Sequence, residues 1–270
     1  MKKVVLITGA SAGMGRETAI LLARNGFTVY GAARRTAKMK DLETFGIRTL
    51  EMDVASEASM AQGVQQIITA EGGVDVLINN AGFGAYGALE DVSMADARYQ
   101  LEVNVFGAAR LIQLVLPRMR EKGGGKIINI SSIGGKFATP YGGWYHASKF
   151  ALEALSDALR NEVKQFGIDV IVIEPGGVKS EWGGIAYDNL LKNSTHSAYH
   201  QTIAQLAGFV KKSLDKGAEP AVIARLILQA ITARKPRLRY VGGYMAQSAV
   251  IARKLLPDRL FDKMIMGQFK

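Results

Sequence analysis

The chain has 270 residues, of which 48% are apolar and 21% are charged, a balance typical of a soluble globular protein. It contains no cysteine, which excludes disulfides and thiolate metal sites and is compatible with a reducing compartment, so we expect a cytoplasmic protein. The formal net charge is +10, but residues 211–270 hold 13 Lys+Arg against 4 Asp+Glu, and no basic stripe with interleaved aromatics indicates a nucleic-acid groove.

The chain alternates between short apolar runs and stretches with helical periodicity. The first run, residues 4–7, is too short for a secretory leader, and no run approaches the roughly 18 apolar residues of a membrane span. The apolar runs predict strands at 3–8, 27–32, 47–52, 74–79, 126–131, 169–174 and 238–242. Helices are predicted near 14–25, 56–71, 94–121 and 144–166. Uniformly apolar strands between helices predict a single-domain α/β fold over residues 1–245, a doubly wound parallel sheet of about seven strands with helices on both faces.

A glycine-rich loop, "TGASAGMG" (8–15), follows the first strand and opens the first helix. Gly9, Gly13 and Gly15 let the backbone turn sharply and approach a phosphate, and the helix N-terminus offers free N–H groups. A tight structural turn is the alternative. The position between strand and helix favours a dinucleotide site.

The end of the second strand indicates which dinucleotide binds. An acidic residue about 20 positions after the loop would hold the ribose hydroxyls of NAD, whereas an arginine there accepts the 2′-phosphate of NADP. No Asp or Glu occurs from 26 to 40, and Arg34 and Arg35 follow the strand. These arginines, with Ser11 as an extra donor, favour NADP(H) over NAD(H), unless they only solvate the strand end.

Tyr145 and Lys149 lie four residues apart in "WYHASK" and therefore on one face of the predicted helix. They are either an incidental surface pair or a phenol whose proton has been made easier to remove. A free tyrosine has a pKa near 10, so it is a poor base at neutral pH.

Several motifs in order along residues 3–245 resemble the short-chain dehydrogenase/reductase family, which has a Rossmann-type fold. They are the glycine loop with its Gly-x-x-x-Gly-x-Gly spacing, "MDV" (52–54), "NNAG" (79–82), "PGGVKS" (175–180) and the Tyr-x-x-x-Lys pair. Where the family usually has threonine, Ser180 would supply the hydroxyl. The resemblance implies that the cofactor is contacted by Gly9, Ser11, Ala12, Gly13, Met14, Gly15, Arg34, Arg35, Asp53, Val54, Asn80, Ala81, Gly82, Pro175, Gly176, Val178 and Ser180.

The same resemblance implies a catalytic tetrad of Asn104, Ser132, Tyr145 and Lys149. Lys149 and an oxidised nicotinamide would lower the pKa of Tyr145, which would exchange a proton with a carbonyl or hydroxyl oxygen. Ser132, selected over its neighbour Ser131, would hydrogen-bond that oxygen, and Asn104 would anchor a water chain to Lys149.

The substrate is indicated only in class. Residues 181–210 follow the Pro-Gly segment, where the family carries its substrate-covering segment. Aromatic residues that could line an apolar cavity, or pack in the core, are Phe83, Tyr86, Phe137, Tyr141, Trp144, Trp182, Tyr187 and Tyr199. They favour a small hydrophobic carbonyl or alcohol over a sugar. The long helix at 144–166 also resembles the branch with 17β-hydroxysteroid and retinol dehydrogenases.

Residues 246–270 form a basic extension. In 249–266, apolar residues recur every three to four positions beside Arg253, Lys254, Arg259 and Lys263. Such a helix could lie on anionic lipid, cover the substrate, contact another subunit, or simply dock on its own core. The family resemblance implies a homodimer or homotetramer through the helices at 94–121 and 144–166.

Three functions compete. The first is an NADP(H)-dependent oxidoreductase that interconverts a hydroxyl and a carbonyl. The second is a non-catalytic NADP(H)-binding redox sensor. The presence of Ser132, Tyr145 and Lys149 argues against it, because binding alone needs no phenol–lysine pair. The third, an epimerase or dehydratase of nucleotide sugars, is disfavoured by the length and the glycine spacing. No metal is expected, since the pair His196 and His200 lacks a third ligand.

Overall fold

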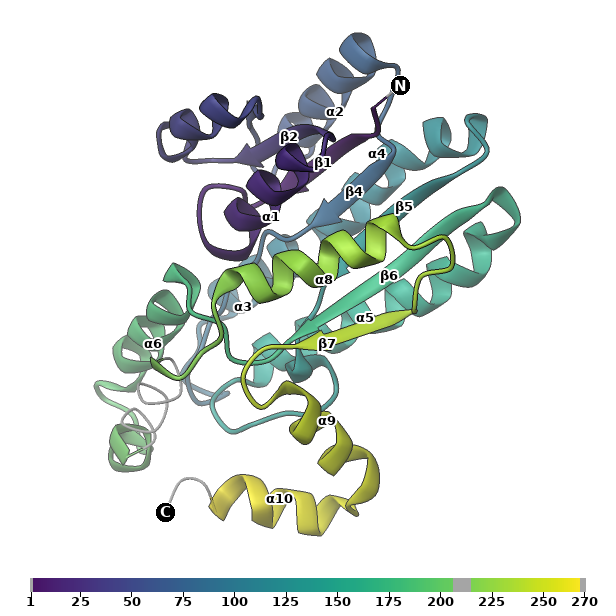
Figure 1. Cartoon of the computed structure of the whole chain (residues 1–270). Coiled ribbons are helices and arrows are strands. Elements are labelled where there is room, and N and C mark those ends of the chain that lie inside the picture. The colour runs from purple at the N-terminus through teal and green to yellow at the C-terminus, as the bar shows by residue number, and fades with distance from the viewer. Residues whose placement is uncertain (1, 206–214, 268–270) are drawn as a thin grey trace.

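The computed structural model describes residues 2–205 and 215–267. Its centre is one parallel sheet of seven strands in the order β3-β2-β1-β4-β5-β6-β7 (Figure 1). The strands are β1 (Val4–Thr8), β2 (Thr28–Ala33), β3 (Arg48–Glu51), β4 (Val76–Asn79), β5 (Gly125–Ile130), β6 (Ile168–Pro175) and β7 (Arg239–Gly242). The predicted doubly wound α/β fold is confirmed. Strands β2 and β3 lie on one side of β1, and β4 lies on the other, so the order in which the chain adds strands to the sheet reverses between β1 and β4. Such sheets bind ligands at this point.

Helices cover both faces of the sheet (Figure 1). On one face, α1 (Gly13–Arg24) and α8 (Pro220–Thr232) pack with apolar side chains of β1, β2 and β6. On the other, α2 (Glu57–Glu71), α4 (Gly107–Glu121) and α5 (Gly143–Val163) bury a second cluster. The central strands β1 and β4 and most of β6 are buried on both sides, which is why their sequences are mainly apolar, whereas the edge strand β3 is partly exposed. Short 3₁₀ helices are η1 (Thr36–Phe45), η3 (Ile133–Gly135) and η4 (Lys164–Phe166).

The predicted helix at 94–121 is not continuous. It consists of α3 (Met94–Leu101), a π-helical turn η2 (Glu102–Phe106) and α4. Such a turn carries one extra residue per turn and is frequent at functional sites. Here Asn104 occupies its middle and is 2% exposed, so the irregular turn places an amide inside the protein.

The C-terminal extension lies beyond the carboxyl ends of the strands, on the same side as α6 (Glu181–Ser194) (Figure 1). The predicted amphipathic stretch is divided into α9 (Ala246–Leu255) and α10 (Asp258–Gly267), because Leu256, which precedes Pro257, is extended. Phe261 and Ile265 of α10 pack on Phe137.

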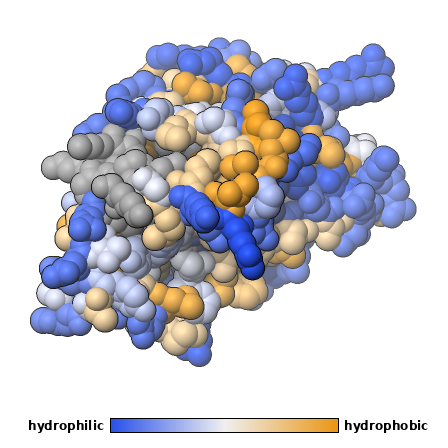
Figure 2. Space-filling view, turned by 90° about the horizontal axis from the view of Figure 1, so that it is seen from below, coloured by the Kyte–Doolittle hydropathy of each residue, from blue (hydrophilic) through white to orange (hydrophobic). Residues whose placement is uncertain are grey.

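Apolar side chains also remain on the outer side of this extension. An apolar patch is visible on the face seen from below in Figure 2, and Ile251, Leu255 and Leu260 are more than half exposed. Contact with anionic lipid stays a prediction, and residues 268–270 lie outside the described part of the chain. No helix in residues 2–205 and 215–267 is both long and apolar enough to span a bilayer.

Candidate active site

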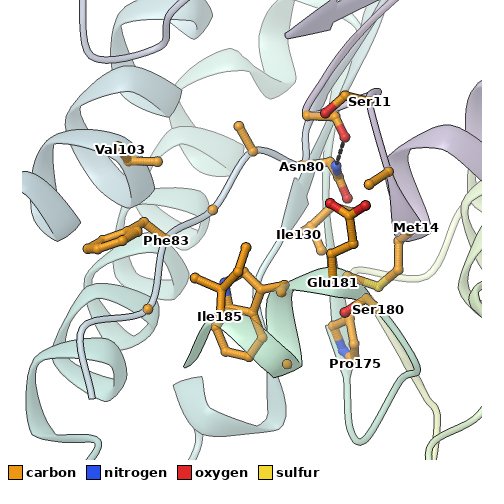
Figure 3. Close-up of a pocket in the computed structure, with 18 of the residues that line it drawn as sticks. Ser11, Met14, Asn80, Phe83, Val103, Ile130, Pro175, Ser180, Glu181 and Ile185 are labelled. Carbon is orange, nitrogen blue, oxygen red and sulfur yellow. Dashed lines mark hydrogen bonds between the residues drawn. The ribbon is translucent and has the colours of Figure 1, made fainter. Parts of the chain in front are cut away.

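A cavity of about 470 Å³ opens at the carboxyl ends of β1, β4, β5 and β6. Figure 3 shows loops from these strands converging on it, with α6 forming one wall. The structure brings the sequence-predicted residues together here: all of them line the cavity except Gly15 and Asn104. Both exceptions lie just behind the lining.

The glycine loop adopts a backbone suited to a phosphate. Gly9 and Gly13 have φ of +69° and +53°, values that side chains disfavour. The first turn of α1 has no side-chain cap and no acidic residue, so its N–H groups are available to an anion. A Cβ at Gly13 would lie 3.1 Å from that of Ser180, narrowing the cleft between the loop and α6. The residues present therefore fit a dinucleotide phosphate.

The loop is fixed to the strand beside it. The Asn80 Nδ2 group donates to the carbonyl oxygens of Thr8 and Gly9 at 2.8 and 3.3 Å, and the Asn80 and Ala81 N–H groups donate to Thr8 Oγ1 at 3.0 Å. A Cβ at Gly15 would lie 2.5 Å from Asn80 Nδ2, so glycine is required there for packing. Gly15 thus supports the loop from behind.

Other predicted cofactor residues surround this loop. Asp53 Oδ1 accepts a hydrogen bond from the Ala55 N–H at 3.0 Å, which fixes the turn after β3 beside the cavity. The Gly176 N–H donates to the Gly242 carbonyl at 2.8 Å, so β7 holds the Pro-Gly segment in place.

Arg34 and Arg35 point to different partners. The Arg34 guanidinium donates to the Tyr99 hydroxyl at 2.7 Å. The Arg35 guanidinium donates to Ser11 Oγ at 3.3 Å, as expected for neighbours in one anion site. Its Nη2 also lies 3.1 Å from a carboxylate oxygen of Glu181, which the sequence did not indicate.

Tyr145 and Lys149 lie on the buried face of α5, and both line the cavity, so they are not an incidental surface pair. Their side chains are not directly bonded: Lys149 Nζ lies 5.9 Å from the centre of the Tyr145 ring and donates to the Ile130 carbonyl at 2.9 Å. Ser132 Oγ accepts from the Gly134 N–H at 3.0 Å and donates to the Pro175 carbonyl at 3.4 Å, and it lines the same cavity as the Tyr145 phenol. Ser131 Oγ, in contrast, is buried and makes no hydrogen bond within the described residues.

The Lys149 charge is not among the causes that shift the pKa of Tyr145, and the effect of an oxidised nicotinamide on it stays a prediction. Burial raises this pKa to about 12, and the hydrogen bond with Ser132 opposes the rise only in part. The rings of Tyr86 and Trp182 pack against the Tyr145 ring, at 5.4 and 5.1 Å between centres, and contribute to its burial. Burial also lowers the pKa of Lys149 to about 8, with Glu153 opposing. Desolvation, not the lysine charge, dominates the site.

Asn104 lies outside the cavity, and its side-chain amide hydrogen-bonds neighbouring protein groups. Its Oδ1 accepts from the Phe83 N–H at 2.8 Å, and its Nδ2 donates to the Phe83 carbonyl and to Ser148 Oγ, both at 2.9 Å. These bonds join the segment after β4 to α5. The water chain implied by the family resemblance stays a prediction.

His146 has a positioning role that the sequence did not indicate. Its Nδ1 lies 2.9 Å from the Gly134 carbonyl, and its Nε2 accepts from the Thr139 N–H at 3.1 Å. Burial lowers its pKa, consistent with a neutral ring. The imidazole thereby fixes the loop after Ser132 against α5.

The remaining cavity wall is largely apolar. Of the predicted aromatic residues, Phe83 and Trp182 line the cavity, whereas Tyr141 packs with Leu190 and Ile203 outside it. Glu181 and Ile185 come from the predicted substrate-covering segment, and lining residues that the sequence did not indicate include Tyr99, Val103 and Ile130. They belong to helices or strand ends whose contribution depends on the tertiary fold. Within residues 2–205 and 215–267, no group of three or more His, Asp or Glu side chains could hold a metal.

The arrangement is that of a nucleotide-dependent oxidoreductase, and comparison with known proteins places the chain in a family. The model of the short chain dehydrogenases matches residues 3–188, and the chain belongs to this family. A short-chain dehydrogenase from Streptomyces avermitilis superposes with a TM-score of 0.82 at 32% identity, over 98% of this chain and 96% of that one. The protein is therefore an NAD(P)-dependent oxidoreductase of the short-chain type.

Its relatives include reductases and a dehydrogenase. The 3-ketodihydrosphingosine reductase of Bacteroides thetaiotaomicron is 37% identical, over 96% of this chain and 95% of the relative. The NADPH-dependent 3-dehydrocapnine reductase of Ornithobacterium rhinotracheale is 33% identical, over 99% and 98%. Human 17-beta-hydroxysteroid dehydrogenase type 1 is 33% identical, over 88% and 77%. This last relative confirms the resemblance to the hydroxysteroid dehydrogenase branch.

Proposed function

We propose that the protein is an NADP(H)-dependent reductase of a hydrophobic ketone, with Tyr145 as proton donor. The observation that carries the proposal is the buried phenol of Tyr145, which lines one cavity together with Ser132, Lys149, Arg35 and Ser11. A binding module or redox sensor needs no such phenol.

Cofactor choice is argued from charge. Arg35 borders the cavity end where Ser11 lies, Lys38 reaches the Glu181 carboxylate at the same place, and no acidic residue occurs between 26 and 40. A 2′-phosphate carries up to two negative charges and is bound well by such a cluster. One relative is named NADPH-dependent, which supports the same preference.

The chemistry follows from the protonation states. With a pKa of about 12, Tyr145 holds its proton at neutral pH and can give it to a carbonyl oxygen. Ser132 would hydrogen-bond that oxygen and orient it toward the phenol. Lys149, with a pKa of about 8, is protonated at neutral pH and lies close enough to stabilise the charge that develops on Tyr145. NADPH, when bound, supplies the hydride.

The substrate class is argued from the cavity wall. Phe83, Trp182 and Ile185 line it, and Tyr86 packs against the Tyr145 ring. Burying apolar surface contributes about 25 cal/mol per Å², so this wall favours a hydrophobic group beside the carbonyl. The names of two relatives, 3-ketodihydrosphingosine reductase and 17-beta-hydroxysteroid dehydrogenase, fit this class.

The test is NADPH consumption with a panel of steroid, retinoid, aliphatic and aromatic ketones. We expect turnover of a hydrophobic member and a loss of about 10³-fold in Tyr145→Phe, the usual range for a general acid. Tyr141→Phe is the matched control, since Tyr141 lies outside the cavity and this variant should retain activity. NADPH binding without turnover across the panel would favour the redox sensor instead.

A further inference from the structure

Glu181, the first residue of α6, reaches across the cofactor cavity to the opposite wall. Its two carboxylate oxygens lie 3.0 Å from Lys38 Nζ and 3.1 Å from Arg35 Nη2. In Figure 3 its carboxylate projects into the cavity toward the side where Ser11 and Asn80 lie. Arg35 joins the two sides, since the same Nη2 donates to Ser11 Oγ.

This contact joins three segments that are distant in sequence: the loop after β1, the segment after β2, and α6. The three charged side chains are about half exposed, between 48% and 49%. Exposed ion pairs contribute little to stability because water and salt screen them. The Glu181 contacts can therefore be exchanged for another anion without unfolding anything around them.

A guanidinium and an ammonium hold Glu181, and the Ser11 hydroxyl lies beside them on Arg35. A 2′-phosphate would use the same groups. A phosphate monoester carries a charge of about −1.5 to −2 at neutral pH, more than a carboxylate. We propose that Glu181 competes with the 2′-phosphate of NADP(H) for Arg35 and Lys38, and thereby couples α6 to cofactor binding. This inference rests on the NADP(H) preference proposed above.

The coupling reaches the catalytic end through the next residues of α6. The Trp182 ring lies 5.1 Å from the Tyr145 ring, and Ile185 lines the same cavity. When a 2′-phosphate binds Arg35 and Lys38, Glu181 at the start of α6 loses its ion pairs with the opposite wall. A cofactor without a 2′-phosphate leaves these ion pairs of Glu181 intact. The wall over Tyr145 therefore responds to the identity of the cofactor.

Binding of adenosine 2′,5′-bisphosphate and of adenosine 5′-monophosphate, measured by calorimetry, tests the competition without any turnover. Removing the competing carboxylate in Glu181→Gln should tighten the bisphosphate by about three- to tenfold, the range of two exposed ion pairs. The monophosphate should change less than about twofold. Glu219→Gln is the matched control: it removes an equal charge from an exposed ion pair with Lys179, at 2.8 Å, outside the cavity.

Fluorescence of Trp182 supplies a second readout. The chain has two tryptophans, so Trp144→Phe leaves Trp182 alone. In this background the bisphosphate should change the emission, the monophosphate should do so far less, and Glu181→Gln should remove most of the bisphosphate response.

The outcomes separate the two proposals. If the bisphosphate binds no better than the monophosphate, the NADP(H) preference fails and this inference with it. If the bisphosphate is preferred but Glu181→Gln binds it as the Glu219→Gln control does, only the role of Glu181 is overturned.

Discussion

Two buried charged sites lie one helical turn apart on α5 and are built in opposite ways. At Lys149, which is 6% exposed, the ammonium donates to the Ile130 carbonyl, and no ion pair is formed within the described part of the chain. At Glu153 the carboxylate is 7% exposed and accepts from both Lys136 and Arg239, at 2.7 and 3.0 Å. The Lys149 site therefore holds an unpaired charge, whereas the Glu153 site holds a charge with two oppositely charged partners.

The paired site extends beyond Glu153. Glu174 of β6 lies within 3.3 Å of Lys136 and 3.1 Å of Arg239, so two cations are shared by two buried carboxylates. Burial, and then the charge of Glu153, raises the pKa of Glu174. The cluster joins α5, β6, β7 and the residue after η3, and lies outside the cavity.

The contrast shows where the fold accepts an energetic penalty. A buried charge with partners recovers much of its desolvation energy, whereas an unpaired one does not. Lys149 borders the cavity, and the desolvation of its ammonium group lowers its pKa to about 8. The site that costs stability is the one positioned for chemistry.

The largest effect is expected from Lys149→Met, which should reduce turnover about 10³-fold, roughly 4 kcal/mol of activation energy. The same change should raise stability at pH 7 by about 1–3 kcal/mol, because it removes a buried unpaired charge. The penalty is complete below the folded pKa of about 8 and disappears as the pH rises toward the unfolded value near 10.5. The stability gain should therefore shrink over that interval.

Urea unfolding at several pH values measures this change. Lys126→Met is the matched control, because Lys126 also donates to backbone carbonyls, at 3.0 and 2.7 Å, but lies outside the cavity. It should leave turnover unchanged. A Lys149→Met protein less stable than the wild type at pH 7 would contradict the account of an unpaired charge.

The second effect concerns the paired site. Glu153→Gln keeps the shape but removes the charge between Lys136 and Arg239, and we expect a loss of about 2–4 kcal/mol in unfolding free energy. Glu121→Gln, at an exposed pair with Arg118, should change it by less than about 0.5 kcal/mol. Urea titrations of both variants give the comparison. Equal effects would show that burial does not decide the value of these ion pairs.

Much of this arrangement was predictable from local sequence. The seven strands follow from apolar runs, and the cavity side chains come from motifs at strand ends, because parallel strands bring their carboxyl ends to one edge. The family, the fold and the convergence of Arg35 with Ser11 were predicted in this way. Homologous motifs also brought Ser132 and Tyr145 together.

What the sequence did not indicate depends on tertiary contacts. Burial raises the pKa of Tyr145, and the Tyr86 and Trp182 rings that pack on its ring come from segments distant in sequence. The cross-cavity contact of Glu181 spans 146 residues to Arg35. Helix α8 was not predicted, although Pro220 opens it at a position typical of helix starts. Its apolar residues are buried against α1 and the sheet.

The smallest effect should come from Asp157, which shares Arg239 with Glu153 but has a side chain 46% exposed. Its oxygens both lie 2.7 Å from Arg239 Nη2, and Asp157→Asn should still cost no more than about 1 kcal/mol, because solvent screens the pair. Burial raises the pKa of Asp157, but the hydrogen bonds from Arg239 and Arg160 lower it by more than burial raises it. The pKa of Asp157 therefore lies below its usual value. The contribution is therefore present above about pH 4 and is lost as the carboxylate is protonated on acidification. Urea titrations at neutral and acidic pH should show the wild type and Asp157→Asn converging as the pH falls. A loss as large as that of Glu153→Gln would mean that Arg239, and not burial of its partner, determines the strength of the cluster.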